Sequence, residues 1–471
     1  MLALVLAASL AAAPAPRAAQ AADTVVHIPR LDALQGVNAF LERAGVHAAL
    51  MRPAVWSAEL HPLFALEPGQ PERLTALGLE PSGPITVSML GGGRLTCTRL
   101  ADPKVFQARA NEVLATAGGQ VEVKPKTSGG VTSVLVPRES GGQAGYALKG
   151  KEACAFLSVG AGFVDDGAGQ ELLKEAARLV GRTPRPDRRL TRVPGVLYVL
   201  QPRRGLVVGV DGSGTELRVE GTAEDLPLPL FQAAGTSPYG AVKPAGLLVS
   251  RARVAPGGVA QAVGSVRARV QEVCPTCPPA EVSTVARRVG GHLTGHVLLL
   301  VDSVKVRGSL RTPAARFFAP RQALAAEVKD AEAVKAALAP LKKFPGAKVL
   351  EDGYALEVKG GTLFVRQEGR HLVVGNDESV TKLLLAALPQ EGAKLPHAVD
   401  FTVDPRRLAR GLSQVSLMDV VSDQQLAGLF AVGLELGPLL ANSERITGWL
   451  DSAPRGAHRF SLTWTLPAAS P

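Results

Sequence analysis

Short apolar runs, separated by glycine, proline and polar residues, recur along the whole chain. The runs at residues 85–90 and 297–301 have the length of strands, whereas residues 170–177 and 379–386 carry apolar side chains at helical spacing. Glycine-rich connections such as residues 91–93 are short enough to join neighbouring strands as antiparallel hairpins. The pattern therefore predicts an α+β fold, with a mainly antiparallel sheet and helices packed on one of its faces.

The same order of elements occurs twice. Residues 25–37 can be laid over residues 247–259, and each segment predicts a strand, a turn and an amphipathic helix. Five further matches follow in the same order: 77–90 with 289–301, 102–106 with 330–334, 155–160 with 371–375, 170–177 with 379–386, and 196–204 with 399–407. Six matches in one order predict two related halves, with insertions and deletions between them.

These matches set the expected domain layout. The first α+β repeat is expected at residues 22–240 and the second at residues 241–471, with the boundary in the turn-rich stretch 234–240. The second repeat carries an additional helical stretch near residues 412–440, which the first repeat lacks.

The first residues predict export. Residues 2–13 form an apolar run that is far shorter than the roughly 20 residues needed to span a bilayer. Ala19-Gln20-Ala21 supplies the small residues that a signal peptidase recognises, so residues 1–21 are expected to be a signal peptide. No later segment is apolar for long enough to cross a membrane. The expected location is the periplasm or the extracellular space, with no transmembrane segment in the mature chain.

Composition narrows the function classes. The chain has 471 residues, which suits two or three domains, and 46% of them are hydrophobic, which is enough for a sizeable core. Aromatic residues make up only 4%, which disfavours a stacking surface for single-stranded nucleic acid. The net charge is +10, but the basic residues are scattered and no recognition motif accompanies them. Nucleic acid is therefore not an expected partner.

Two motifs carry a resemblance. Residues 77–84 have the pattern Leu-Gly-Leu-x-Pro-x-Gly-Pro before a strand, and Gly375-Asn-Asp-x-x-Val380 follows a short strand. Together they resemble exported bacterial proteins grouped under domains of unknown function. The resemblance covers most of the mature chain and implies an envelope protein of two similar α+β units. It implies no reaction.

The four cysteines suggest disulfides, because their number is even and the chain is expected to be exported. Cys97 and Cys154 each lie in a predicted strand of the first half. Their positions are compatible with a disulfide within one sheet or with two separately buried thiols, and the sequence does not decide between them.

Cys274-Pro-Thr-Cys277 permits three interpretations. A structural disulfide in a helical turn is favoured, because the pair follows a predicted helix and the helix dipole disfavours a thiolate at that end. A thiol redox site is the first alternative, since the spacing is that of thioredoxin-like proteins. A zinc site with His292 and His296 is the second, because the four residues have zinc-finger spacing. An oxidising compartment and the glycines beside both histidines weaken the zinc interpretation.

Other reactive patterns are weaker still. Ser379-x-x-Lys382 matches the Ser-x-x-Lys of penicillin-recognising enzymes, but the companion motifs are missing. Asp165-Asp166 and Asp377-Glu378 are paired carboxylates that follow predicted strands, where acidic residues also favour helix N-termini. No phosphate-binding loop or nucleophile elbow is present, and no cofactor is expected.

The leading hypothesis from sequence is a non-catalytic exported envelope protein that binds a protein or an apolar ligand on its sheet or between its halves. A thiol redox or zinc-dependent protein that uses Cys274 and Cys277 is the alternative, and a purely structural scaffold is the third hypothesis. Neither the ligand nor the partner can be named from the sequence.

Overall fold

A computed structural model describes residues 22–158, 167–181, 187–224, 231, 235–242, 245–274, 277–306, 318–359, 361–388, 392–415, 426–452 and 458–468. The chain divides into two compact units, Met1–Asp225 and Leu226–Pro471. This boundary, between Asp225 and Leu226, comes earlier in the chain than the stretch 234–240 in which the sequence predicts it. Strand β11 (Gly235–Ser237) pairs with β19 (Ala393–Leu395) and so belongs to the second unit. The expected signal peptide, residues 1–21, lies outside the described residues.

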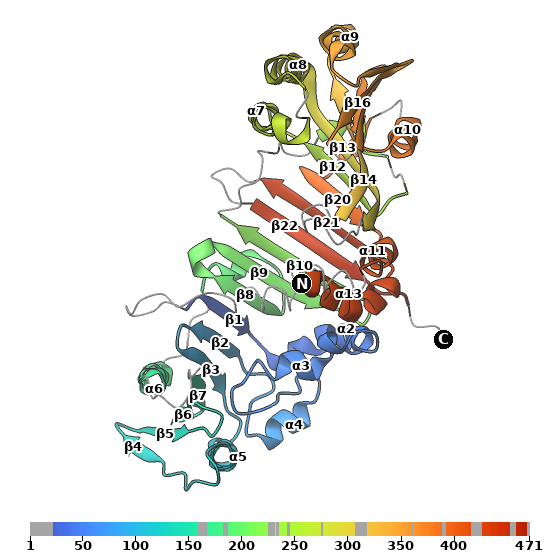
Figure 1. Cartoon of the computed structure of the whole chain (residues 1–471). Coiled ribbons are helices and arrows are strands. Elements are labelled where there is room, and N and C mark those ends of the chain that lie inside the picture. Colours follow the sequence, from blue (N-terminus) through green and yellow to red (C-terminus); the bar gives the residue numbers. More distant parts are fainter. Residues whose placement is uncertain are drawn as a thin grey trace. The chain divides into compact units, whose positions relative to one another are not determined.

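Antiparallel strands form the sheet of the first unit (Figure 1). Their bounds are β1 Thr24–Ile28, β2 Ile85–Leu90, β3 Gly93–Arg99, β4 Lys126–Ser128, β5 Val131–Pro137, β6 Gln143–Lys149, β7 Glu152–Ser158, β8 Leu197–Gln201, β9 Leu206–Gly212 and β10 Glu216–Ala223. Their order in the sheet is β4-β5-β6-β7-β3-β2-β1-β8-β9-β10.

Helices pack on both faces of this sheet. Their bounds are α2 Gln35–Gly45, α3 Pro53–Ser57, α4 Pro71–Ala76, α5 Pro103–Ala117 and α6 Ala168–Leu179. Tyr146 of β6 donates a hydrogen bond of 2.8 Å to Asn111 of α5. The next residue, Ala147, packs in a core cluster with Leu172 of α6. Consecutive strand residues point to opposite faces. The expectation of helices on one face is therefore wrong, because β6 and β7 are apolar at consecutive positions and both faces need cover.

The sheet of the second unit is also antiparallel. Its strands are β12 Leu248–Arg253, β13 Leu293–Val306, β14 Phe318–Val328, β15 Lys348–Leu350, β16 Gly353–Val358, β17 Gly361–Glu368, β18 His371–Gly375, β20 Val399–Val403, β21 Arg445–Ser452 and β22 His458–Thr465. Their order is β15-β16-β17-β18-β14-β13-β12-β20-β21-β22.

Helices cover both faces here as well. Their bounds are α7 Pro256–Val273, α8 Pro279–His292, α9 Ala331–Leu338, α10 Glu378–Ala386, α11 Pro405–Leu412 and α13 Leu426–Ala441. Leu372 of β18 packs in one core cluster with Val334 of α9, whereas Val373 packs in another with Val380 of α10. The additional helical stretch expected near 412–440 corresponds to the end of α11 and to α13. None of the described helices is both long and apolar enough to cross a bilayer.

Candidate functional site

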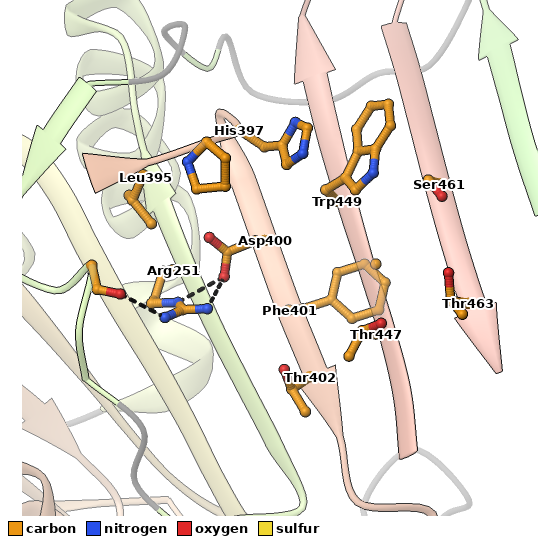
Figure 2. A pocket seen from close by; sticks show the side chains of 13 residues that line it. Arg251, Leu395, His397, Asp400, Phe401, Thr402, Thr447, Trp449, Ser461 and Thr463 are labelled. Atoms are coloured by element: carbon orange, nitrogen blue, oxygen red, sulfur yellow. Dashed lines mark hydrogen bonds and ion pairs between the residues drawn. The ribbon is translucent and has the colours of Figure 1, made fainter. Parts of the chain in front are cut away.

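A cavity of about 270 Å³ opens on one face of the second unit's sheet, over β12, β20, β21 and β22 (Figure 2). The strand register places its polar side chains in two rows. The first row is Arg251, Asp400, Trp449 and Ser461, each directly opposite the next on the neighbouring strand. The second row is Thr402, Thr447 and Thr463. Residues two apart on a strand share a face, so both rows belong to one polar surface.

An ion pair closes one side of this cavity. Arg251 donates from Nε to Asp400 Oδ1 at 2.7 Å and from Nη1 to the Gly240 carbonyl at 2.8 Å. Its Nη2 also pairs with Asp400 Oδ1. The other carboxylate oxygen, Asp400 Oδ2, is buried and accepts no hydrogen bond within the described part of the chain. Most buried polar atoms in proteins have a partner, so this oxygen is an exception that needs an explanation.

A stacked pair of rings forms another side. The rings of His397 and Trp449 are nearly parallel, with centroids 4.2 Å apart and an interplanar angle of 7°. Asp451 fixes the imidazole, because His397 Nδ1 lies 2.8 Å from Asp451 Oδ2 and the other carboxylate oxygen accepts from the Ala398 amide. The Asp451–His397 pair therefore orients the ring that supports Trp449.

These residues do not form a catalytic triad. A histidine that is oriented by a carboxylate needs a hydroxyl within hydrogen-bond reach to act as a general base. Among the described residues no hydroxyl bonds to His397, and Ser461 lies on the far side of Trp449 from it (Figure 2). Among the described residues, no hydroxyl is therefore positioned to be activated by His397.

A second hollow, of about 620 Å³, lies between α11 and α13. Helix α13 carries apolar residues on all sides, and Leu434 is 64% exposed. The C-terminal end of this helix is anchored, since Leu439 is buried and Ser443 accepts a hydrogen bond of 2.8 Å from Trp464. The exposed apolar part of α13 lies beside the hollow, and we call this hollow the helix groove.

Two cations line the helix groove. Arg406 and Arg410 lie one turn apart on α11, and both are exposed. Neither side chain forms an ion pair or a hydrogen bond within the described residues. The neighbouring Arg407 differs, because its Nη1 pairs with Asp302 Oδ1 at 3.0 Å. Helix α11 therefore presents one arginine to a carboxylate of the sheet and two to the groove.

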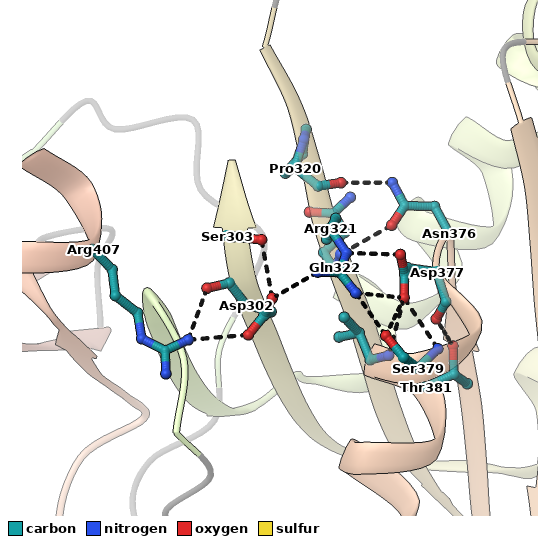
Figure 3. A network of polar contacts seen from close by, with 11 residues as sticks. Asp302, Ser303, Pro320, Arg321, Gln322, Asn376, Asp377, Ser379, Thr381 and Arg407 are labelled. Atoms are coloured by element: carbon teal, nitrogen blue, oxygen red, sulfur yellow. Dashed lines mark hydrogen bonds and ion pairs between the residues drawn. The ribbon is translucent and has the colours of Figure 1, made fainter. Parts of the chain in front are cut away.

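A polar network ties α10 and α11 to the sheet (Figure 3). Arg321 of β14 donates to both carboxylate oxygens of Asp377, at 2.7 and 3.0 Å, and it also lies 3.4 Å from Asp302. The hydrogen bond from Arg321 is the main cause that holds the pKa of Asp377 well below its usual range, and hydrogen bonds from Ser379 and from the Val380 amide act in the same direction. Asp377 is also the N-cap of α10.

This network shows what the residues of two sequence patterns contact, namely Ser379-x-x-Lys382 and the carboxylate pair Asp377-Glu378. The Ser379 hydroxyl donates to Asp377 Oδ1 at 2.6 Å, and Lys382 pairs with Glu378 at 2.9 Å. Lys382 is thus paired with Glu378. Asp377 caps α10 and pairs with Arg321. The other carboxylate pair, Asp165-Asp166, lies outside the described residues.

Both pairs of cysteines are joined as disulfides. Cys97 and Cys154 lie directly opposite each other on β3 and β7 and are joined, which settles the alternative of two separate thiols. Cys274 and Cys277 are joined at the end of α7. They are 4% and 6% exposed and belong to the core cluster that also contains residues of α8 and α9.

The zinc interpretation is not supported. The sulfur atoms of Cys274 and Cys277 are bonded to each other, so neither is a thiolate ligand. His292 ends α8, whereas His296 lies in β13 opposite Arg253. Within the described residues no three or more histidine, cysteine, aspartate or glutamate side chains are grouped as metal ligands. Burial of the disulfide also argues against ready thiol exchange.

We expect the purified, untagged protein to contain no stoichiometric zinc and the Cys274–Cys277 bridge to react slowly with glutathione at neutral pH. The sulfurs are buried in an apolar core, where an attacking thiolate cannot reach them without local unfolding. Metal analysis and mass spectrometry of alkylated protein measure both. About one zinc per chain, lost when Cys274 and Cys277 are replaced with serine, would contradict this expectation.

Sequence reasoning missed the residues of the sheet cavity. A signal was present, because polar residues alternate with apolar ones in each strand: Asp400 and Thr402 in β20, Thr447 and Trp449 in β21, Ser461 and Thr463 in β22. Alternation predicts a polar face on each strand, but only the register shows that the three faces adjoin.

Comparisons with known proteins add little. No family model matches the chain, and no curated protein matches it. A solved structure titled "Structure of crystal form I of TP0453" aligns at 8% sequence identity with a TM-score of 0.21, covering 78% of this chain and 94% of that one. A likeness this low carries no argument about fold or function.

Proposed function

We propose that this protein is an exported, non-catalytic binding protein whose helix groove takes a single-chain amphiphile with a carboxylate headgroup, such as a fatty acid. The observation that carries the proposal is the apolar wall of α13, with Leu434 exposed, beside Arg406 and Arg410, whose side chains have no partner among the described residues. The absence of an activated nucleophile in the sheet cavity supports a binding role over catalysis there.

The dimensions and the lining suit such a ligand. Small-molecule sites occupy roughly 300–1,000 Å³ and are mostly apolar with few polar groups, and the groove of about 620 Å³ fits this range. Gly437 faces open space on the α13 wall, Gly433 lies close to Leu412, and Leu412 and Phe430 supply apolar contacts. An apolar hollow with a few charged groups at its edge is typical of small-molecule sites.

The headgroup is argued from charge. Arginine binds carboxylates through two parallel hydrogen bonds, and two arginines one turn apart can share one headgroup. Asp302, the carboxylate that Arg407 of the same helix contacts, is engaged by Arg407 and Arg321. An anionic headgroup at the groove's edge would supply the partner that both side chains lack within the described residues.

We also infer that the two units are copies of one ancestral domain. The strand orders given above correspond one to one, from β4 with β15 to β10 with β22. Asp102 and Asp330 support the pairing, since each caps the helix that follows the corresponding strand, β3 or β14. The α11–α13 stretch has no helical counterpart between β8 and β9, where only the short 3-10 turn Pro202–Arg204 occurs. The groove is therefore an addition to the second copy.

We expect dodecanoate to bind about tenfold more tightly than dodecanol, which has the same chain but no charge, because only dodecanoate pairs with Arg406 and Arg410. Isothermal titration calorimetry of the mature chain measures both affinities. Replacing both arginines with glutamine should remove the difference, and Leu434→Asp should weaken both ligands.

The matched control is Lys342→Gln with Lys343→Gln, which removes two exposed positive charges of the same unit away from the groove. This variant should retain the preference for dodecanoate. The proposal fails if neither ligand binds the unaltered chain, or if the Arg406→Gln/Arg410→Gln variant keeps the preference.

A further inference from the structure

We propose that the sheet cavity over β20, β21 and β22 is a second binding site, for one ring of a neutral saccharide. This inference is independent of the helix groove, because the two hollows share no lining residue. It requires that the cavity offers unused hydrogen-bonding groups, a ring for stacking contacts, and no net charge.

The unused groups come first. Asp400 is 8% exposed, lines the cavity, and its Oδ2 atom is buried without a partner among the described residues. A carboxylate oxygen accepts hydrogen bonds and donates none. A ligand that satisfies this atom must therefore bring a donor, such as a hydroxyl group. A buried oxygen without a hydrogen-bond partner carries the free-energy penalty of its desolvation. A hydrogen bond from a ligand hydroxyl would offset this penalty.

Hydroxyl groups line the same cavity as this acceptor. Thr402, Thr447, Ser461 and Thr463 line the cavity (Figure 2), and none of the four hydroxyls bonds to another group in the described part of the chain. A hydroxyl both donates and accepts, so these side chains match a ligand whose own hydroxyls do the same. A polyhydroxylated ligand is the class of molecule with this property at several adjacent positions.

The aromatic wall supports the same class. Trp449 lines the cavity and is held by the nearly parallel His397 ring, which Asp451 orients. Its indole N–H donates to no group in the described residues. A tryptophan combines a large apolar surface with a polar donor, and this pairing suits a sugar ring, which has apolar C–H faces and polar edges.

Charge excludes the main competitors. Arg251 already donates to Asp400 Oδ1 and to the Gly240 carbonyl, and His397 is paired with Asp451, so the described lining residues offer no unpaired cation to a phosphate or carboxylate. An anion would also be repelled by the unsatisfied carboxylate oxygen of Asp400. A cationic ligand gains little, because the Arg251–Asp400 pair has no net charge. A neutral ligand is therefore favoured.

The size sets the length of the ligand. The cavity volume of about 270 Å³ lies just below the usual range for small-molecule sites, which fits a single ring with any further sugar units outside the cavity.

The test uses the mature chain with Trp56→Phe and Trp464→Phe, so that Trp449 is the only remaining tryptophan of the three. The probes are the methyl β-glycosides of glucose, galactose, mannose and N-acetylglucosamine, with tetrahydropyran as the matched ring that lacks hydroxyls. We expect at least one glycoside to change Trp449 fluorescence and to show saturation transfer by NMR, and we expect tetrahydropyran to do neither.

Variants then locate the site. Thr402→Val with Thr463→Val removes two hydroxyls at nearly constant shape and should weaken binding about tenfold. Asp400→Asn should weaken it at least as much. Thr465→Val, two residues further along β22, is the control and should leave binding unchanged. If Asp400→Asn unfolds because Arg251 loses its partner, the threonine variants still decide the question.

Two results would overturn the proposal. One is that no glycoside of the panel binds at millimolar concentration. The other is that a glycoside binds equally well to the Thr402→Val/Thr463→Val variant and to the Trp449→Ala variant. Either result leaves the dodecanoate experiment unaffected, since that experiment reads the helix groove.

Discussion

Replacing Cys97 and Cys154 with serine should lower the free energy of unfolding of the first unit by about 4 kcal/mol. The bridge joins residues that are 57 apart in sequence. A cross-link over a loop of this length removes much of the conformational freedom of the unfolded chain, and the chain-entropy relation gives this magnitude. The bridge also joins neighbouring strands in the middle of the sheet order, where loss of pairing would affect strands on both sides.

The second disulfide is the matched control. Cys274 and Cys277 are only 3 apart, so the same relation predicts about 2 kcal/mol for their replacement. Denaturant unfolding in a Trp449→Phe/Trp464→Phe background follows the first unit through Trp56. A Trp56→Phe background follows the second unit through Trp449 and Trp464. A loss at Cys274–Cys277 that equals or exceeds the loss at Cys97–Cys154 would contradict the loop-length argument.

Local signals in the sequence were the ones that could be interpreted correctly. Residues 102–106 and 330–334 were matched as equivalent segments, and Asp102 and Asp330 each accept a backbone hydrogen bond at the start of the helix that follows. A capping aspartate acts within three residues of its own position, so its role is visible in the sequence. The antiparallel sheet was likewise predictable from short apolar runs with short connections.

The side on which helices pack was not predictable in the same way. The buried runs of β6 and β7 show that both of their faces are covered, but the expectation relied on a single amphipathic layer. Continuous apolar strands are typical of sheets that are covered on both faces. The continuous apolar character of β6 and β7 therefore predicts helices on both sides of the sheet.

The sheet cavity depends on long-range register. Asp400 lies opposite both Arg251 and Trp449, which are far from it in sequence. A shift of one residue in either pairing would turn these side chains to opposite faces. The cysteines show the same limit, because Cys97 and Cys154 were each assigned to strands while their pairing stayed open until the register placed them face to face.

Replacing Asp377 with asparagine should destabilise the second unit by about 2 kcal/mol at neutral pH, because the variant loses charge-assisted hydrogen bonds from Arg321. The folded state lowers the pKa of Asp377 below its unfolded value of about 3.9, so the folded state favours the ionised carboxylate. Its contribution is therefore complete above that unfolded pKa and is lost as the pH falls toward the folded pKa. The difference between the unaltered protein and Asp377→Asn should thus be largest near pH 7 and shrink below about pH 4.

Chemical denaturation at several pH values, read through Trp449 and Trp464, measures this difference. The partner variant Arg321→Met separates the ion pair from the capping role of Asp377. In the Arg321→Met background, the Asp377→Asn change should cost less, because the main cause of the lowered pKa is already gone. The residual cost then reports the cap, since the carboxylate also accepts from the Ser379 and Val380 amides. A cost for Asp377→Asn that is independent of pH, or identical in both backgrounds, would show that the Arg321–Asp377 pair does not stabilise the fold in the way its geometry indicates.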